Sequence, residues 1–230
     1  MGAVIVNTLR YNYIETCFSN NHLSGFLLDI GCGRKPYKKI YKKYVTKSIG
    51  IEMEDTPNIN SSVDLYYDGK HIPFKAQTFD IVLCTEVLEH VPNFDEFLSE
   101  IYRVLKKGGH LIITTPFFQL LHETPHDYYR YTPFGLKVIL ERNSFIIMNI
   151  VGFSNTIGFI ITYFVRFPLK IFNKLTKLIK IKFFNTPYNP LLFIFVLLPQ
   201  ILFLILYRSF QINDLGQIKN NSSYGILLKK

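Results

Sequence analysis

A short apolar run that ends in an acid and two closely spaced glycines constrains this chain more than any other feature. The segment reads Leu27-Leu28-Asp29-Ile30-Gly31-Cys32-Gly33. The apolar run predicts a buried strand, and the glycines allow a sharp turn in which the backbone approaches a ligand closely. A second apolar run ends at Glu52, about 20 residues further on, where an acid at a strand tip can bind the hydroxyls of a ribose. The pattern predicts a site for a nucleoside-containing ligand.

The charge is divided unevenly along the 230 residues, whose formal net charge is +9. Residues 1–152 carry 16 Lys and Arg against 16 Asp and Glu, whereas residues 153–230 carry 10 against the single acid Asp214. The basic part is also the most apolar part of the chain. This combination favours an anionic membrane surface as a partner over nucleic acid, and we expect no nucleic-acid partner.

The cysteines indicate the chemical setting. Cys17, Cys32 and Cys84 are scattered and show neither a disulfide framework nor the spacing of a zinc site. We therefore expect a reducing, cytoplasmic setting and no metal ligands. The first residues lack the basic and then apolar layout of a signal peptide, which agrees with that setting.

Strand and helix patterns alternate along the first two thirds of the chain, which predicts a parallel sheet covered by helices on both faces. Helices are expected within residues 1–25 and over about 36–45, 93–106 and 133–142, the third of them stopping at Gly108-Gly109. Strands are expected at residues 26–30, 48–52, 63–67, 79–84, 110–114, 145–151 and 223–229.

If residues 223–229 form the seventh strand, the chain divides into a core (residues 1–152), an insertion between strands 6 and 7 (residues 153–220) and the final strand of the core (residues 221–230). Within residues 157–182, residues 157–167 are apolar with the single Arg166, and residues 169–182 interleave apolar side chains with lysines, which is typical of a basic amphipathic helix.

Residues 191–207 of this insertion are uncharged and contain Pro199. A straight helix of that length spans about 26 Å, less than the ~30 Å hydrocarbon core of a bilayer. Because both ends of the insertion would join one cytoplasmic sheet, we favour a monotopic or re-entrant hairpin on the inner face of the cell membrane. The alternatives are a cap on the core, a dimer interface, or a true membrane span without a seventh strand.

The glycine turn excludes two common nucleotide sites. No third glycine follows Gly33 as a dinucleotide fold requires, and the chain has no phosphate-binding loop of the G-x-x-x-x-G-K-[ST] type. The ligand is therefore expected to lack a pyrophosphate. Asp68 lies in a later loop from which its carboxylate can reach an adenine amino group.

Several segments, in this order and spacing, resemble the class I S-adenosylmethionine-dependent methyltransferases, in particular the small bacterial type with a ubiquinone-methyltransferase-like core. The matching segments are Leu28-Asp29-Ile30-Gly31-Cys32-Gly33, Gly50-Ile51-Glu52, Ile72-Pro73-Phe74, Phe79-Asp80-Ile81-Val82, Glu86-Val87-Leu88-Glu89-His90-Val91 and Arg103-Val104-Leu105-Lys106-Lys107-Gly108-Gly109. The resemblance covers roughly residues 26–152 and implies a Rossmann-like α/β fold with a seven-stranded, mostly parallel sheet whose last strand is antiparallel. One departure is Lys35, which stands where the family usually has its third glycine.

The resemblance also implies how S-adenosylmethionine would be bound. Gly31 and Gly33 would pass close to its methionine part, Asp29 would hold the turn and the amino group, Glu52 would bind the ribose hydroxyls, Asp68 would face the adenine amine, and Thr85 would lie beside the methionyl group. The alternative for each acid is a solvated carboxylate in a loop.

A polar loop after the strand at residues 110–114 is the candidate acceptor side. Residues 122–132 hold two histidines, two acids, an arginine and three tyrosines. His126 beside Asp127 suggests a general base with an orienting carboxylate, and Arg130 suits a sugar or an acidic group, although it can instead pair with Asp127. His122 is interpreted as a solvated loop residue, and His90 as a helix-end residue that shapes the pocket.

The segment Pro125-His126-Asp127-Tyr128-Tyr129-Arg130-Tyr131-Thr132 resembles a loop that recurs in methyltransferases of surface-polysaccharide gene clusters. This resemblance implies a glycan or glycolipid acceptor that is O-methylated at the cytoplasmic membrane surface. One alternative is a methyltransferase for a quinone, a lipid or another small hydrophobic molecule. The other is a non-catalytic membrane-associated scaffold, against which the intact glycine turn and Glu52 argue.

Overall fold

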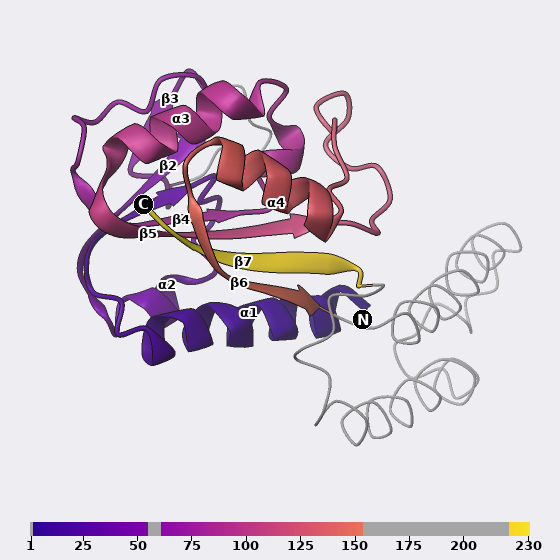
Figure 1. Ribbon diagram of the computed structural model, residues 1–230, viewed down its shortest axis with the longest axis horizontal. Helices are drawn as coiled ribbons and strands as arrows, with labels where there is room; N and C mark the ends of the chain where they lie inside the picture. The colour runs from indigo at the N-terminus through magenta and orange to yellow at the C-terminus, as the bar shows by residue number, and fades with distance from the viewer. Residues whose placement is uncertain (1, 55–60, 154–220) are drawn as a thin grey trace, which may run out of the picture.

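The computed structural model of this chain describes residues 2–54, 61–153 and 221–230. They form one seven-stranded sheet with helices on both faces (Figure 1). Nearly all of the expected insertion, including the segments 157–182 and 191–207, lies outside the described residues, so its membrane association stays a prediction. Of the helices in the described ranges, none combines the length and the hydropathy that a membrane crossing requires.

The elements follow one another in the alternating order that the sequence predicts. The strands are β1 (Gly25–Ile30), β2 (Val45–Met53), β3 (Leu65–Tyr67), β4 (Phe79–Thr85), β5 (Leu105–Pro116), β6 (Ile146–Phe153) and β7 (Ser223–Lys229). The helices are α1 (Gly2–Asn20), α2 (Lys38–Tyr41), α3 (Phe94–Val104) and α4 (Pro133–Arg142), with a 3₁₀ turn, η1 (Leu88–His90), between β4 and α3.

The sheet has the strand order β3-β2-β1-β4-β5-β7-β6. The strands from β3 to β5 pair in parallel, whereas β7 runs antiparallel to both β5 and β6. This confirms the expected antiparallel last strand at residues 223–229. The carboxyl ends of β1, β2, β4 and β5 therefore meet at one edge of the sheet, where a ligand site is expected in folds of this kind.

Alternating side chains of the central strands supply the two cores. Leu27 packs in a cluster with Ile14 of α1, whereas Leu28 packs in a second cluster with Leu98 of α3 and Leu136 of α4. Figure 1 shows the same division, with α1 and α2 on one face of the sheet and α3 and α4 on the other. Because successive strand residues point to opposite faces, a fully apolar strand is what a sheet covered on both sides requires.

Two helix boundaries differ from the prediction. Helix α3 ends at Val104, slightly before the expected end at residue 106, because residues before β4 hydrogen-bond to its last carbonyls and Leu105 already pairs with Phe79 of β4. Helix α2 covers four residues in place of the ten expected over 36–45. The chain leaves it through turns in which Lys43 and Tyr44 donate to carbonyls three residues earlier, and β2 begins at Val45 to pair with β1.

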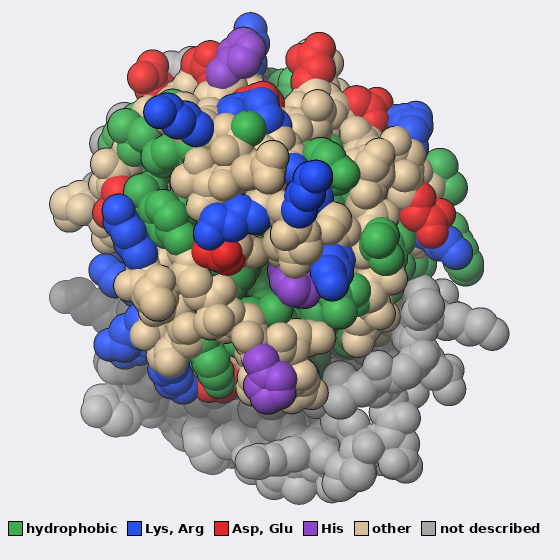
Figure 2. Space-filling model, turned by 60° about the vertical axis from the view of Figure 1, so that its left-hand side comes forward, with side chains coloured by type: hydrophobic (Ala, Val, Ile, Leu, Met, Phe, Trp, Pro, Cys, Tyr) green, Lys and Arg blue, Asp and Glu red, His purple; other side chains and the backbone are tan. Residues whose placement is uncertain are grey.

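The start of α4 agrees with its prediction. The Thr132 hydroxyl accepts a hydrogen bond from the Gly135 backbone N–H at 3.0 Å, and Pro133 occupies the first helical position. On the face drawn in Figure 2, acidic and basic side chains of the described residues are intermixed, as the equal numbers of both signs in residues 1–152 lead one to expect.

The difference in burial between β7 and β6 allows a direct test of the place of β7 in the sheet. Ile226 of β7 is 0% exposed, whereas Ile146 of the neighbouring β6 is 63% exposed. Ile226→Ala should lower the free energy of unfolding by about 2–5 kcal/mol, because it leaves a cavity in the core that α3 and α4 cover. The matched control Ile146→Ala should change it by about 0.5 kcal/mol or less. Urea unfolding measures both, and equal effects would contradict the internal position of β7.

Candidate functional site

The turn after β1 has the backbone conformation that its glycines permit. Gly31 and Gly33 have φ values of +64° and +47°, in the left-handed region that favours glycine. A Cβ on Gly31 would lie 2.2 Å from Cγ2 of Val87, so the turn packs directly on the segment that follows β4. A Cβ on Gly33 would meet no atom of the described residues within 4 Å. The turn therefore opens onto space at Gly33, where a ligand can approach the backbone.

Lys35 keeps the left-handed turn although it replaces a glycine of the family pattern. Its φ is +51°, and its side chain lies over Gly50 with Nζ 2.5 Å from Oδ2 of Asp64. The same Asp64 oxygen accepts the backbone N–H of Gly50 at 2.7 Å. The lysine thus ties the turn after β1 to the residues around β2, and this ion pair offsets the cost of a left-handed non-glycine residue.

Glu52 and Gly33 are brought together as the sequence predicted. Oε2 of Glu52 accepts a hydrogen bond from the Gly33 backbone N–H at 2.9 Å. Burial raises the pKa of the Glu52 carboxyl, and the nearby Glu123 raises it further. Glu123 belongs to the loop after β5, so that loop reaches across to the tip of β2. The ribose-binding role of Glu52 stays a prediction.

Asp29 is buried beneath the turn. Asp29 is 1% exposed, and its Oδ2 atom has no hydrogen-bond partner among the described residues. Burial raises the pKa of the Asp29 carboxyl to about 7, and the neighbouring Tyr41 hydroxyl and Lys35 ammonium offset this only in part. A buried acid with an unused oxygen can take a further donor from a ligand or a water molecule.

Asp68 and Thr85 belong to the same edge of the sheet but have different surroundings. Asp68 follows β3 and is exposed, and its Oδ1 accepts the backbone N–H groups of Lys70 and His71 at 2.8 Å each. These bonds lower the pKa of the Asp68 carboxyl. Thr85 ends β4 and pairs with Thr114 of β5. Their roles toward adenine and the methionyl group stay predictions.

An acidic segment follows β4 at this edge of the sheet. Glu86 has a φ of +55°, and its carboxylate is 3.0 Å from the Thr114 hydroxyl and 2.7 Å from the Arg10 guanidinium. Arg10 comes from α1 and is itself buried. Helix α1 therefore contributes a cation to the site, although the sequence gives no local sign of this contribution.

The loop after β5 is fastened to η1. The backbone N–H groups of Tyr128 and Tyr129 both donate to the Glu89 carbonyl, at 2.9 and 3.2 Å. The Tyr131 hydroxyl donates to the Leu88 carbonyl at 3.2 Å. The loop after β5 therefore lies against the segment that follows β4.

The expected pair of His126 and Asp127 is not formed. Asp127 accepts two hydrogen bonds from the Arg130 guanidinium, at 2.5 and 2.7 Å, and one from the His122 backbone N–H at 2.9 Å. Arg130 lowers the pKa of the Asp127 carboxyl to about 2. His126 instead has Nδ1 3.1 Å from the Tyr128 hydroxyl. The Asp127 carboxylate pairs with Arg130 and not with His126, because a guanidinium that donates two hydrogen bonds forms the stronger interaction.

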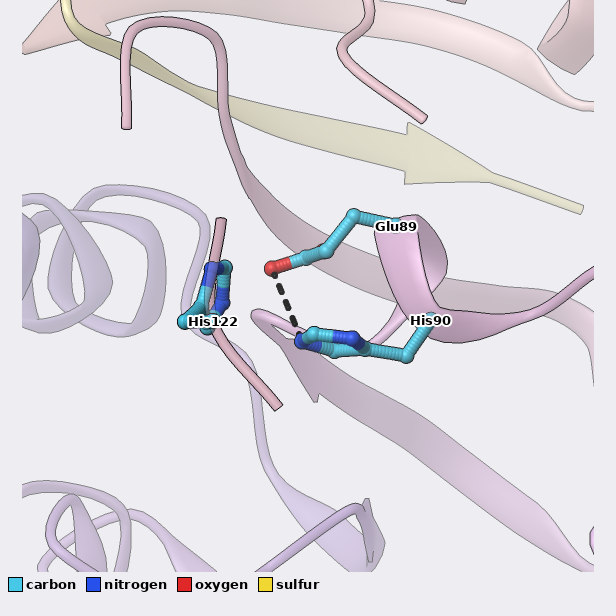
Figure 3. A group of neighbouring side chains, drawn as sticks. All are labelled: Glu89, His90 and His122. Atoms are coloured by element: carbon cyan, nitrogen blue, oxygen red, sulfur yellow. Dashed lines mark ion pairs between the residues drawn. The ribbon is translucent and has the colours of Figure 1, made fainter. Parts of the chain in front are cut away.

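Three side chains for which the sequence predicted no catalytic or ligand-binding role converge in this region. Oε1 of Glu89 lies 3.8 Å from Nε2 of His90, and the rings of His90 and His122 have centroids 4.8 Å apart (Figure 3). The expectation of no metal ligands did not foresee this group, in which one candidate ligand atom from each residue lies within 4.8 Å of the others. The signal present in the sequence was the Glu89-His90 pair directly after a strand end.

The comparisons with known proteins agree with this geometry. Residues 28–113 match the family described as Methyltransferase domain. A Ubiquinone biosynthesis O-methyltransferase of Pseudomonas entomophila is 31% identical over 137 residues, which cover 54% of this chain and 55% of that protein. The chain therefore spans about half the length of this curated relative.

Two solved structures share the fold of the described residues. A SAM dependent methyltransferase from Archaeoglobus fulgidus is 19% identical, with a TM-score of 0.56 over 96% of this chain and 94% of that one. Phosphoethanolamine N-methyltransferase 2 of Haemonchus contortus, in complex with S-adenosyl-L-methionine, is 17% identical, with a TM-score of 0.53 over 96% of this chain and 52% of that one.

Residues 28–113 match the Methyltransferase domain family, and the described residues share the fold of solved S-adenosylmethionine-dependent methyltransferases. The site fits that cofactor. The turn opens onto space at Gly33, the Glu52 carboxylate stands beside it, and Asp29 has an unused oxygen.

Asp29 gives the site a predicted pH dependence. Folding raises its pKa from 3.8 to about 7, so between these values the folded chain holds this proton more tightly than the unfolded chain. Relative to Asp29→Asn, the free energy of unfolding of the wild type should fall as the pH rises from about 4 to about 7, by up to about 4 kcal/mol, and then level off. Urea unfolding across this range measures it, and a pH-independent difference would contradict the assignment.

Proposed function

We propose that this chain transfers a methyl group from S-adenosylmethionine to a hydroxyl oxygen of an acceptor bound beyond the carboxyl ends of β4 and β5. The observation that carries this proposal is the contact of the glycine turn with the segment after β4, through Gly31 and Val87. It sets a cofactor-binding turn directly against a cluster of ionisable side chains.

In this proposal the two sides of the edge have different tasks. Glu52 binds the ribose hydroxyls, Gly31 and Gly33 admit the methionine part, and Asp29 holds the amino group from beneath. Asp68 faces the adenine amine, and Thr85 lies beside the methionyl group.

S-adenosylmethionine supplies a methyl group on a positively charged sulfur. The chain has to align the acceptor oxygen with that methyl group, which by itself provides much of the acceleration in a two-substrate reaction. It also has to remove the proton of the hydroxyl. His126 stays the candidate base, with the Tyr128 hydroxyl, and not Asp127, as the group that orients its ring. Arg130 is engaged by Asp127 and holds the loop that carries His126.

The acceptor side favours a polar molecule. Five ionisable side chains gather there: Glu86, Glu89, His90, His122 and Arg10. A sugar offers hydroxyls that such groups bind. We therefore favour a glycan or lipid-linked glycan. The name of the Pseudomonas entomophila relative, a Ubiquinone biosynthesis O-methyltransferase, supports a quinone-type small molecule as the second candidate.

The location proposed for the enzyme is the inner face of the cell membrane. This part rests on the sequence of residues 153–220 alone, in which basic and apolar residues are concentrated. An enzyme held there would meet lipid-linked acceptors.

Glu52 provides the sharpest test of cofactor binding. Glu52→Ala should weaken the affinity for S-adenosylmethionine by about 10-fold or more, because two hydroxyls lose a charged acceptor. Glu141→Ala, at an exposed position of α4, should leave the affinity unchanged. Isothermal titration calorimetry measures both variants, with circular dichroism as the check on folding. Equal affinities for the two variants would show that the ribose assignment is wrong.

The acceptor is tested by transfer of labelled methyl from S-adenosylmethionine into membranes of the source organism, followed by solvent extraction. Label in a mildly acid-labile lipid fraction is expected and supports a lipid-linked glycan. Label in an acid-stable quinone or lipid fraction would replace that acceptor with the second candidate. Label only in water-soluble material would remove the membrane-bound acceptor, and absence of any transfer would favour the non-catalytic scaffold.

A further inference from the structure

The environment of Glu89 is unusual for an acidic side chain in a folded protein. Its side chain is 0% exposed, and among the described residues neither carboxylate oxygen has a hydrogen-bond partner. Buried polar groups nearly always have a partner, and a buried carboxylate without one calls for an explanation. The nearest nitrogen of a titratable neighbour, Nε2 of His90, is 3.8 Å away, which is beyond hydrogen-bond distance. A third atom placed between these groups would satisfy both.

Both neighbouring histidines are held in the same way. Nδ1 of His90 lies 2.6 Å from the His126 carbonyl oxygen, a group that only accepts hydrogen bonds, so Nδ1 carries the proton. Nδ1 of His122 lies 3.3 Å from the Asp127 carboxylate and 3.3 Å from the Leu120 carbonyl oxygen, which are also acceptors. In the neutral tautomer each ring then keeps the lone pair of Nε2 for a further partner.

This is the arrangement that orients histidine ligands around a metal ion. A ligating imidazole typically donates its other N–H to a carboxylate or a backbone carbonyl, which fixes the tautomer and the direction of the lone pair. His122 has both kinds of acceptor at Nδ1, and His90 has a carbonyl. Figure 3 shows the Glu89 carboxylate and both rings turned toward one another.

We propose that Glu89, His90 and His122 bind a divalent transition-metal cation through one carboxylate oxygen and two imidazole Nε2 atoms. One ligand atom of each residue lies within 4.8 Å of the others, a span that a contraction around one ion can close. Two imidazoles and a carboxylate are a ligand set of zinc and other transition metals, whereas magnesium prefers oxygen ligands alone. The ion neutralises the buried carboxylate and takes up one of its unused oxygens.

The surrounding structure holds these ligands in place before any ion arrives. Glu89 and His90 belong to η1, and the loop that carries His122 is fastened to η1 by the bonds of Tyr128, Tyr129 and Tyr131 described above. Asp127 is locked by Arg130 and supports His122 from behind. The Asp127–Arg130 pair, first interpreted as part of an acceptor site, thereby acquires a positioning role.

The ion would act on the acceptor, and this part rests on the proposed function. Three protein ligands leave coordination positions for an oxygen from solvent or from the acceptor. A hydroxyl bound to a divalent cation loses its proton at a lower pH than a free one. The site thus selects acceptors that can present an oxygen to the ion, and it makes that oxygen the more reactive nucleophile.

The test is metal binding by the full chain after treatment with a chelator and removal of the chelator. Isothermal titration with ZnCl₂ and with MnCl₂ should show one site per chain. Glu89→Gln and His122→Ala should each weaken this binding by about 100-fold or more, because each removes a ligand and not only a supporting group. The matched control is His22→Asn, which removes an exposed histidine after α1 and keeps a residue that tolerates its positive φ. It should bind the metal as the wild type does.

Thermal unfolding provides a second readout. The metal should raise the Tm of the wild type and of His22→Asn, and leave the Tm of both ligand variants unchanged. If Glu89→Gln does not fold, the partly exposed His122→Ala decides alone. Absence of binding in the wild type, or equal binding in wild type and His122→Ala, would overturn the proposal.

The proposal of the metal site and the proposal of methyl transfer can be tested independently of each other. Metal binding is measured without cofactor or acceptor, and cofactor binding is measured without metal. Glu52→Ala should lose affinity for S-adenosylmethionine and keep the metal, whereas His122→Ala should lose the metal and keep the cofactor. Parallel loss of both ligands in either variant would mean that the variant disturbs the whole edge of the sheet, and the separation of the two sites would be wrong.

Discussion

The parallel pairing of β1 with β4 at the centre of the sheet is the interaction on which the rest of the site depends. The two strands run side by side from Leu27 and Ile81 to Ile30 and Cys84, so that the segments following them begin at the same level. The absence of a side chain at Gly31 then allows these segments to touch. A cofactor turn and an acidic, histidine-bearing turn meet there because register and one small residue bring them together.

The fold could be predicted from the sequence because its determinants are local or periodic. Apolar runs marked the strands, and Thr132-Pro133 marked the start of α4. The local pattern of residues 223–229 predicted a strand, and the resemblance added its antiparallel direction. Nothing local in these residues indicates that the strand inserts between β5 and β6. The end of α3 was misplaced because β4 captures residues whose own pattern continues a helix. Pairing with a distant strand cannot be read from a helix-forming segment.

The site was predictable to a smaller extent, and for a physical reason. Gly33 and Glu52 lie at strand ends whose meeting follows from the topology, so their proximity was foreseen. The partners of Asp127 and His126 depend on side-chain directions within one irregular loop, which adjacency in sequence does not fix. The approach of Arg10 to Glu86, and of His122 to Glu89, requires the three-dimensional arrangement of α1, η1 and the loop after β5. A periodic pattern in the sequence does not indicate which polar groups come together from positions far apart along the chain.

The position of β7 has a consequence for how the molecule is made. This strand lies between β5 and β6, yet it follows residues 154–220 in the chain. During synthesis, β5 and β6 therefore leave the ribosome with the edges that face β7 unpaired, and they stay so until residues 223–229 emerge. Exposed strand edges invite pairing with other chains. The folding of this sheet is thus completed by an internal strand, and the nascent chain depends on protection of two open edges for as long as the intervening segment takes to be translated.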